Sequence, residues 1–136
     1  RPENSFVARF IGENNTMNGE IKEINEKECA VKSSNGEVIF ANPISVNKVG
    51  EHTSMSLRPE RVIINPSSDV KNKFDASIQE VIYHGDHTRL RVKLLDQDDF
   101  ILKVPNASNS FSFENGKSIS IGWNAKDCRA LDIIKD

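Results

Sequence analysis

The chain has 136 residues, of which 37% are hydrophobic and 28% are charged, and its formal net charge is -2. This length suits one domain with a substantial core, or two very small units that share a core. The charge balance offers no basic surface for nucleic acid or anionic lipid, and no apolar run approaches the ~20 residues that span a bilayer, so we expect a cytoplasmic protein.

The first fifteen residues differ in pattern from the rest of the chain. Between Asn4 and Gly12, four apolar residues are spaced as on one face of a short helix, which would end at the glycine. These residues are Phe6, Val7, Phe10 and Ile11. The polar residues Asn14–Thr16 then resemble a linker. We therefore predict a short N-terminal helix and linker over residues 1–15, followed by a separate domain over residues 16–136.

From Met17 onward, alternating apolar residues and turn residues predict about ten short strands. The clearest hairpin signals are Ser34-Asn35-Gly36 and the acidic segment from Asp96 to Asp99. The expected strands cover residues 19–24, 29–32, 38–40, 54–58, 62–64, 74–83, 90–94, 100–104, 118–122 and 130–133.

These strands form two halves, residues 17–66 and 73–136, with the same order of elements. Glu20–Ile24 resembles Ser77–Val81, and the hairpin into Val38–Phe40 resembles the hairpin into Phe100–Leu102. Each half is too small to bury a sufficient core by itself. We therefore predict an all-β fold in which two repeated β-units pack as one barrel-like body.

A proline corner follows the strand that contains Met55 and Leu57. Pro59 cannot donate a hydrogen bond to a sheet and pushes the preceding residue toward an extended conformation, so the chain turns there. Arg58 and Glu60 flank this proline as a charged pair. In the second half, Trp123–Asp127 occupies the equivalent corner.

The segment Ser56-Leu57-Arg58-Pro59-Glu60 resembles the hallmark of the transport-associated OB-like (TOBE) domain, which ends the ATPase subunits of bacterial ABC importers. Residues 6–15 resemble the end of the preceding nucleotide-binding domain. Tyr83–Arg89, Gly122-Trp123 and Asp127–Asp132 resemble the spermidine/putrescine branch more than the maltose branch. The resemblance implies that both β-units are OB-like and that Arg1 is not a natural start.

The resemblance further implies a regulatory and dimer-supporting domain of an importer for polyamines or a similar small solute, located at the inner face of the plasma membrane. The implied partners are the nucleotide-binding domain of its own chain, a second copy in a homodimer and, indirectly, the membrane permease subunits. The residues that we expect to make interdomain or regulatory contacts are Arg58, Pro59, Glu60, Trp123, Asp127 and Arg129.

The sequence contains no Gly-x-x-x-x-Gly-Lys-Ser/Thr phosphate loop and no apolar strand ending in an aspartate that could hold magnesium. We therefore expect no enzymatic activity and no catalytic, cofactor-binding or metal-binding residues in this chain. ATP and magnesium are expected on the missing nucleotide-binding domain.

Two other functions compete with this interpretation. Related two-unit domains on oxyanion importers bind their anion through backbone N–H groups, so a small-ligand sensor is the main alternative. An OB-like body also suggests single-stranded nucleic-acid binding, but one Trp, one Tyr and an acidic charge balance argue against it.

Three further features have simple structural explanations. His84, Asp86 and His87 could present a metal site but lack a strong further ligand nearby, so we expect a solvated turn. Asp96, Asp98 and Asp99 lack the spacing of a calcium-binding loop. Cys29 and Cys128 are expected to be reduced, partly buried thiols, although sequence alone does not exclude a disulfide between them.

Overall fold

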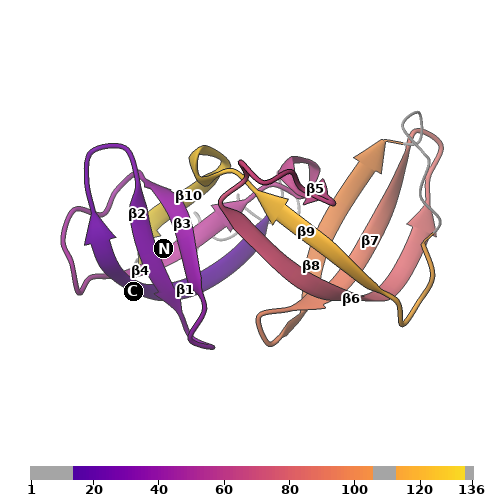
Figure 1. The fold of residues 1–136 in the computed structure, drawn as a ribbon, viewed down its shortest axis with the longest axis horizontal. Helices are drawn as coiled ribbons and strands as arrows, with labels where there is room; N and C mark the ends of the chain where they lie inside the picture. The colour runs from indigo at the N-terminus through magenta and orange to yellow at the C-terminus, as the bar shows by residue number, and fades with distance from the viewer. Residues whose placement is uncertain (1–13, 106–112, 134–136) are drawn as a thin grey trace. The chain divides into compact units, whose positions relative to one another are not determined.

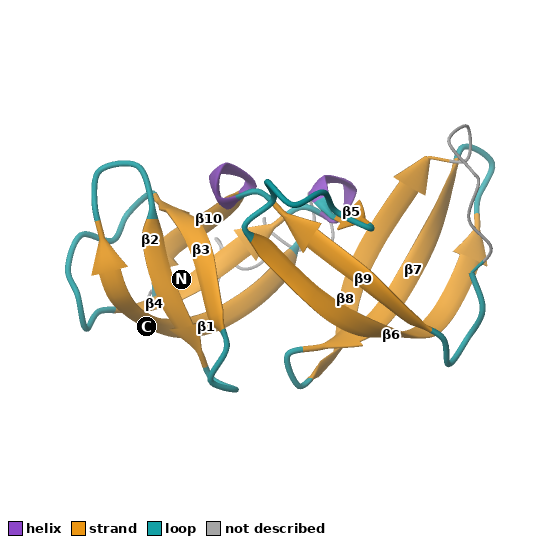
Figure 2. Cartoon of the chain, in the orientation of Figure 1, coloured by secondary structure: helices purple, strands orange, loops and turns teal. Residues whose placement is uncertain are grey.

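The computed structural model describes residues 14–105 and 113–133, which form ten β-strands and two three-residue 3-10 helices (Figures 1 and 2). The predicted all-β class is confirmed. The predicted N-terminal helix lies outside the described residues. Within the described ranges, no helix is long and apolar enough to cross a membrane.

The first compact unit contains the described residues up to Arg58 and from Asn124 onward. Its five strands form a closed barrel in the order β1-β2-β3-β10-β4, with β4 pairing to β1. The pair β3–β10 is parallel, and the other pairs are antiparallel. The strands are β1 (Asn15–Ile24), β2 (Cys29–Ser33), β3 (Val38–Pro43), β4 (His52–Leu57) and β10 (Cys128–Asp132).

The period-2 patterns in the sequence account for the core of this barrel. In β4, Thr53, Met55 and Leu57 are buried, and the residues between them face outward, as a half-buried strand requires. Ile21 and Val31 lie opposite each other on β1 and β2 and are both fully buried. Burial of each such side chain contributes ~1.5–3 kcal/mol, so the alternation fixes which face of each strand points inward.

The second compact unit runs from Pro59 to Trp123 and contains a five-stranded antiparallel sheet in the order β5-β9-β6-β7-β8. Its core contains Trp123, whose ring centroid lies 5.3 Å from that of Phe74 and 5.5 Å from that of Phe100. The strands are β5 (Ile63–Ile64), β6 (Asn72–Tyr83), β7 (His87–Leu94), β8 (Gln97–Pro105) and β9 (Ser118–Trp123).

The predicted repeat is confirmed by the register of β1 and β6. Asn15 pairs with Leu57 at the start of β1, and Asn72 pairs with Trp123 at the start of β6. Both asparagines are buried. The register of β1 with β2 shifts between Ile21 and Glu23, and that of β6 with β7 shifts between Ile78 and Glu80. A bulge therefore falls at the same place in both repeats.

The two repeats exchange their last strands. β5 is the last strand of the first half of the sequence but pairs with β9 of the second half. β10 is the last strand of the second half but pairs with β3 and β4 of the first half, and its yellow ribbon lies among the indigo and magenta strands in Figure 1. The sequence repeats and the compact units are therefore different divisions of the chain.

Two local expectations need correction. Asn15 and Thr16, expected in a linker, are the first residues of β1, because Asn15 pairs with Leu57 and Thr16 with Ser56. The acidic hairpin turns at Leu95 and Asp96, which have φ values of 53° and 65°. Two consecutive positive φ values are typical of a two-residue type I′ turn, so Asp98 and Asp99 belong to β8.

Candidate functional site

The first corner (residues 58–61) joins the end of β4 to unit 2. Pro59–Arg61 forms a 3-10 helix, η1, and the backbone N–H of Val62 donates to the carbonyl of Pro59 at 3.4 Å. Proline suits the first position of a helical turn, where no backbone donor is needed. Pro59 is buried, whereas Arg58 and Glu60 are exposed and form no ion pair with a described residue. Both charges are therefore available to a partner.

The second corner (residues 124–127) contains another 3-10 helix, η3 (Ala125–Asp127), in which the N–H of Asp127 donates to the carbonyl of Asn124 at 3.0 Å. This confirms the predicted equivalence of the two corners. Asp127 is half-buried and the neighbouring Lys126 is exposed. The corners share a backbone shape but carry different charges, so they offer different surfaces to a partner.

Trp123 precedes the second corner and is fully buried in unit 2. Its indole N–H has no hydrogen-bond partner among the described residues. An unpaired buried donor typically costs ~1–3 kcal/mol, so hydrophobic packing must outweigh this cost. In this structure the indole is a core group and not an exposed contact surface.

Arg129 lies on the outer face of the unit 1 barrel. It is exposed on β10, opposite Ser56 of β4 and Asn42 of β3. The hydroxyl of Ser56 accepts a hydrogen bond from the side-chain amide of Asn14 at 3.1 Å. Arg129 forms no ion pair with any residue in the described ranges, so its guanidinium is free to meet an acidic group.

Hydrogen bonds anchor the end of β10 beyond Arg129. The hydroxyl of the buried Thr53 donates to the carbonyl of Leu131 at 2.7 Å. Ser45 accepts from the N–H of Asp132 at 2.9 Å and donates to the Asp132 carboxylate at 2.7 Å. The last strand is therefore bonded to both the β3–β4 loop and β4.

The six residues predicted from sequence do not share one unit. Arg58, Asp127 and Arg129 belong to unit 1, whereas Pro59, Glu60 and Trp123 belong to unit 2. Pro59 and Trp123 are buried, and the four polar residues reach solvent at least in part. A contact role for these residues stays a prediction.

The His84–His87 turn joins β6 to β7. The two imidazole rings stack with centroids 4.6 Å apart, and Nδ1 of His87 lies 2.8 Å from the carboxylate of Asp86. This hydrogen bond lowers the pKa of Asp86 from its ordinary value. No group of three metal-ligating side chains is assembled within residues 14–105 and 113–133.

Cys29 and Cys128 are both buried in unit 1 and are not joined by a disulfide. Burial raises the pKa of the Cys29 thiol above its usual value, and the charge of Glu28 adds to the shift. A thiol with a raised pKa is a poor nucleophile at neutral pH. Cys29 is therefore suited to packing and not to chemistry.

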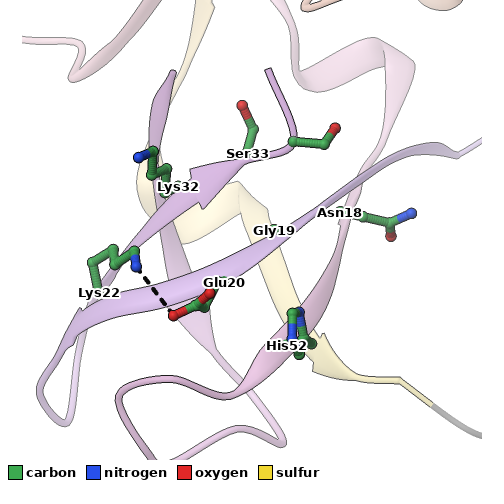
Figure 3. Close-up of a pocket in the computed structure, with 8 residues that line it drawn as sticks. Asn18, Gly19, Glu20, Lys22, Lys32, Ser33 and His52 are labelled. Atoms are coloured by element: carbon green, nitrogen blue, oxygen red, sulfur yellow. Dashed lines mark hydrogen bonds and ion pairs between the residues drawn. The ribbon is translucent and has the colours of Figure 1, made fainter. Parts of the chain in front are cut away.

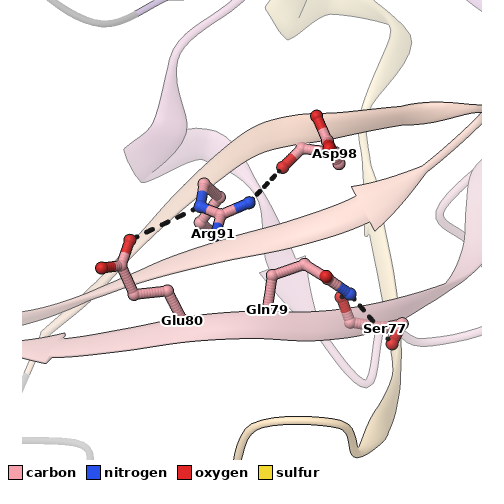
Figure 4. A network of polar contacts seen from close by, with 5 residues as sticks. All are labelled: Ser77, Gln79, Glu80, Arg91 and Asp98. Atoms are coloured by element: carbon pink, nitrogen blue, oxygen red, sulfur yellow. Dashed lines mark hydrogen bonds and ion pairs between the residues drawn. The ribbon is translucent and has the colours of Figure 1, made fainter.

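A polar network spans three strands on the surface of unit 2 (Figure 4). Arg91 on β7 lies 3.4 Å from the carboxylate of Glu80 on β6, and it donates to the backbone carbonyl of Asp98 on β8 at 2.8 Å. Nearby, the amide of Gln79 donates to Ser77 at 3.3 Å. The contacts of Arg91 link β7 to β6 and to β8 and so support the sheet. They also leave the Arg91 side chain occupied on both sides.

An open groove on unit 1 contains charged residues that the sequence interpretation did not single out (Figure 3). It has a volume of about 380 Å³ and lies around Gly19 of β1. One sequence signal was present, since a glycine inside a strand often marks a close approach of backbones or a ligand. The lining side chains that carry charge or can become charged are Glu20, Lys22, Lys32 and His52.

The family model described as "TOBE domain" matches residues 55–131, which is more than half of the chain. The chain is also similar to proteins named spermidine/putrescine import ATP-binding protein PotA. The PotA of Trichodesmium erythraeum (strain IMS101) is 31% identical over 98% of this chain and 37% of its own length. The PotA of Rubrobacter xylanophilus is 26% identical over 96% of this chain and 34% of its own length. The chain thus spans about a third of the length of these relatives.

A solved structure supports the assignment of the fold. The cytoplasmic molybdate-binding protein ModG, with molybdate bound, matches 88% of this chain and 96% of its own chain with a TM-score of 0.74. Its sequence identity is 13%, so this similarity concerns the fold alone. The proline corner, the repeated five-stranded units and the matched family model agree, and the chain belongs to the TOBE domain family.

Proposed function

We propose that this chain is the C-terminal regulatory domain of the ATP-binding subunit of an ABC importer for polyamines or a similar small solute. The observation that carries this proposal is the match of nearly the whole chain to about a third of spermidine/putrescine import ATP-binding proteins. In this role the chain binds no ATP itself. ATP and magnesium belong to the nucleotide-binding domain of the complete subunit.

The two corners and Arg129 are suited to contacts with neighbouring domains. Arg58, Glu60 and Arg129 are exposed charges on short, hydrogen-bonded backbone segments. The backbone that carries these charges is already ordered, and charge complementarity would favour the correct partner. Their proposed partners are the nucleotide-binding domain and a second subunit, which would act beside the permease at the inner face of the membrane.

The test compares the complete subunit, assembled with its permease subunits in liposomes, with a subunit that ends before residue 14 of this chain. We expect spermidine to stimulate ATP hydrolysis and uptake by the complete transporter. The shortened subunit should retain ATP hydrolysis but lose its coupling to spermidine. ATP hydrolysis by the isolated chain, or unchanged coupling after removal of the domain, would contradict the proposal.

Small-ligand sensing is the second candidate, and it is favoured by the similarity in fold to a molybdate-binding protein. In this case a tetrahedral oxyanion or the transported solute would bind the chain directly. Native mass spectrometry with molybdate and, separately, with spermidine distinguishes the candidates. A stoichiometric complex with either compound would support sensing, and its absence would favour a role in protein contacts alone.

A further inference from the structure

The backbone of Gly19 on β1 lines the groove on unit 1. A Cβ atom at this position would lie 2.5 Å from the carbonyl oxygen of Lys32 and 2.6 Å from Cγ1 of Val31. Both distances are shorter than any ordinary contact, so the packing of β1 against β2 requires glycine here. Val31 is fully buried, so a side chain at this position would point toward the barrel core, and Gly19 lines the groove with its backbone alone (Figure 3).

Charged side chains from three strands line the groove. Glu20 and Lys22 of β1 form an ion pair of 3.1 Å. The hydrogen bond that Lys22 donates in this pair is the main cause of the lowered pKa of Glu20. The charges of Lys22, His52 and Lys32 lower this pKa further. The side chains of Lys32, near the end of β2, and His52, at the start of β4, form no ion pair or hydrogen bond with another side chain in the described part of the chain. One carboxylate thus faces two lysines and a histidine.

Neutral hydrogen-bonding groups complete the lining. The side chains of Asn18 and Ser34 are exposed and make no hydrogen bond to another described residue. The backbone N–H of Ser34 donates to the carbonyl of Asn18 at 3.3 Å, which holds the two residues at one end of the groove. The groove therefore offers an amide and a hydroxyl in addition to its surplus positive charge.

We propose that this groove binds a phosphate group, held chiefly by Lys32 and His52 and hydrogen-bonded by Asn18 and Ser34. A phosphate has several acceptor oxygens and can meet donors from different strands at once, whereas a carboxylate presents only two oxygens. A polyamine does not suit the groove, because the only carboxylate is already paired with Lys22. The proposal does not depend on the transporter role.

The experiment is a titration of the isotopically labelled chain with inorganic phosphate, followed by backbone amide chemical shifts at constant ionic strength. We expect saturable shifts at Gly19 and around Lys32, with no such change for matched sodium chloride. A parallel titration with adenosine monophosphate distinguishes free phosphate from a phosphate ester. Tighter binding of the nucleotide would assign the groove to a phosphate monoester, and tighter binding of phosphate to the free anion.

Substitutions with opposite expected effects separate this site from general surface charge. Lys32→Gln should weaken binding about five- to tenfold, whereas Glu20→Gln should tighten it, because it removes the repelling carboxylate. Lys27→Gln makes the same charge change in a turn of the same unit, outside the groove, and should leave the dissociation constant unchanged. Non-saturable shifts, or equal effects of Lys27→Gln and Lys32→Gln, would overturn the proposal.

Discussion

Arg58 and Glu60 differ from Pro59, which lies between them, in burial and in their role in the fold. Pro59 is buried and sets the shape of the first corner, whereas the two charges are exposed and unpaired among the described residues. Exposed charges seldom contribute much to stability. A role for the two charges in contacts outside this chain stays a prediction.

Replacement of both Arg58 and Glu60 by Ala should change the free energy of unfolding of the chain by about 1 kcal/mol or less. In the assembled transporter, the same change should alter the coupling of ATP hydrolysis to spermidine. Urea unfolding and liposome assays measure the two effects. Lys93→Ala, an exposed charge on β7, provides the control. A large loss of stability would instead make Arg58 and Glu60 structural residues.

The raised pKa of Cys29 predicts how stability depends on pH. Above the ordinary thiol pKa, the unfolded chain loses the Cys29 proton while the folded chain retains it. The stability present below the ordinary thiol pKa of about 8.5 should therefore fall as the pH rises above that value. Urea midpoints measure this fall, and Cys29→Ala should flatten it. An equal slope in the variant would assign the dependence to other groups.

At the scale of elements, close strand pairing imposes two strict glycine positions. A Cβ at Gly122 of β9 would lie 2.2 Å from the carbonyl oxygen of Asn72 on β6, much as one at Gly19 would collide with β2. Gly85 in the β6–β7 turn has no atom near the position of a Cβ and no positive φ. A methyl group would therefore collide with a neighbouring strand at Gly19 and Gly122 but would meet open space at Gly85.

Gly122→Ala should destabilise the chain by about 1–3 kcal/mol, because β9 must move away from β6 to relieve the collision. Gly85→Ala provides the matched control and should be nearly neutral, since its added methyl group meets open space. Urea unfolding followed by the fluorescence of the single tryptophan, Trp123, reports on this unit directly. Equal stabilities of the two variants would show that the backbone accommodates the extra atom.

The exchanged strand β10 provides a second prediction at this scale. A chain that ends at Trp123 lacks β10, so β3 and β4 lose the strand that joins them. We expect unit 1 to lose its amide chemical-shift dispersion, whereas Trp123 keeps the fluorescence of a buried indole. The opposite result, with unit 2 unfolded and unit 1 intact, would mean that the sequence halves fold as units without exchange.

At the scale of the whole molecule, the barrel begins at Asn15, and the residues before Asn14 lie outside the description of the fold. The four apolar residues between Phe6 and Ile11 belong to the segment that resembles the end of a nucleotide-binding domain. A cluster of such side chains without that domain favours self-association.

A chain that starts at Asn14 should therefore keep the strand content of the longer chain and shift any dimer toward monomer. Circular dichroism and light scattering after size exclusion measure the two properties. As a control, replacement of Phe6 and Phe10 by Ser in the full 136-residue chain should reproduce the shift. Loss of the β-structure on truncation would make the N-terminal residues part of this domain's own core.

Much of the local structure could be predicted from the sequence. Alternation placed Met55 and Leu57 in the core, Gly36 marked a hairpin with a φ of 96°, and Pro59 marked a corner. The repeat was also visible, because Glu20–Ile24 and Ser77–Val81 occupy equivalent places on β1 and β6. These features depend on near neighbours in the chain, whose side chains and backbone angles set turns and strand faces directly.

The tertiary structure alone decided which strands pair. Nothing near Ile63 or Cys128 indicates that β5 joins the second repeat and β10 the first, since strand partners are chosen by long-range hydrogen bonds and packing. The same is true of Trp123, which sequence offered as a contact but packing places between Phe74 and Phe100. Lys32 and His52 likewise lie twenty residues apart and meet around Gly19 only because β2 and β4 both pair with β1.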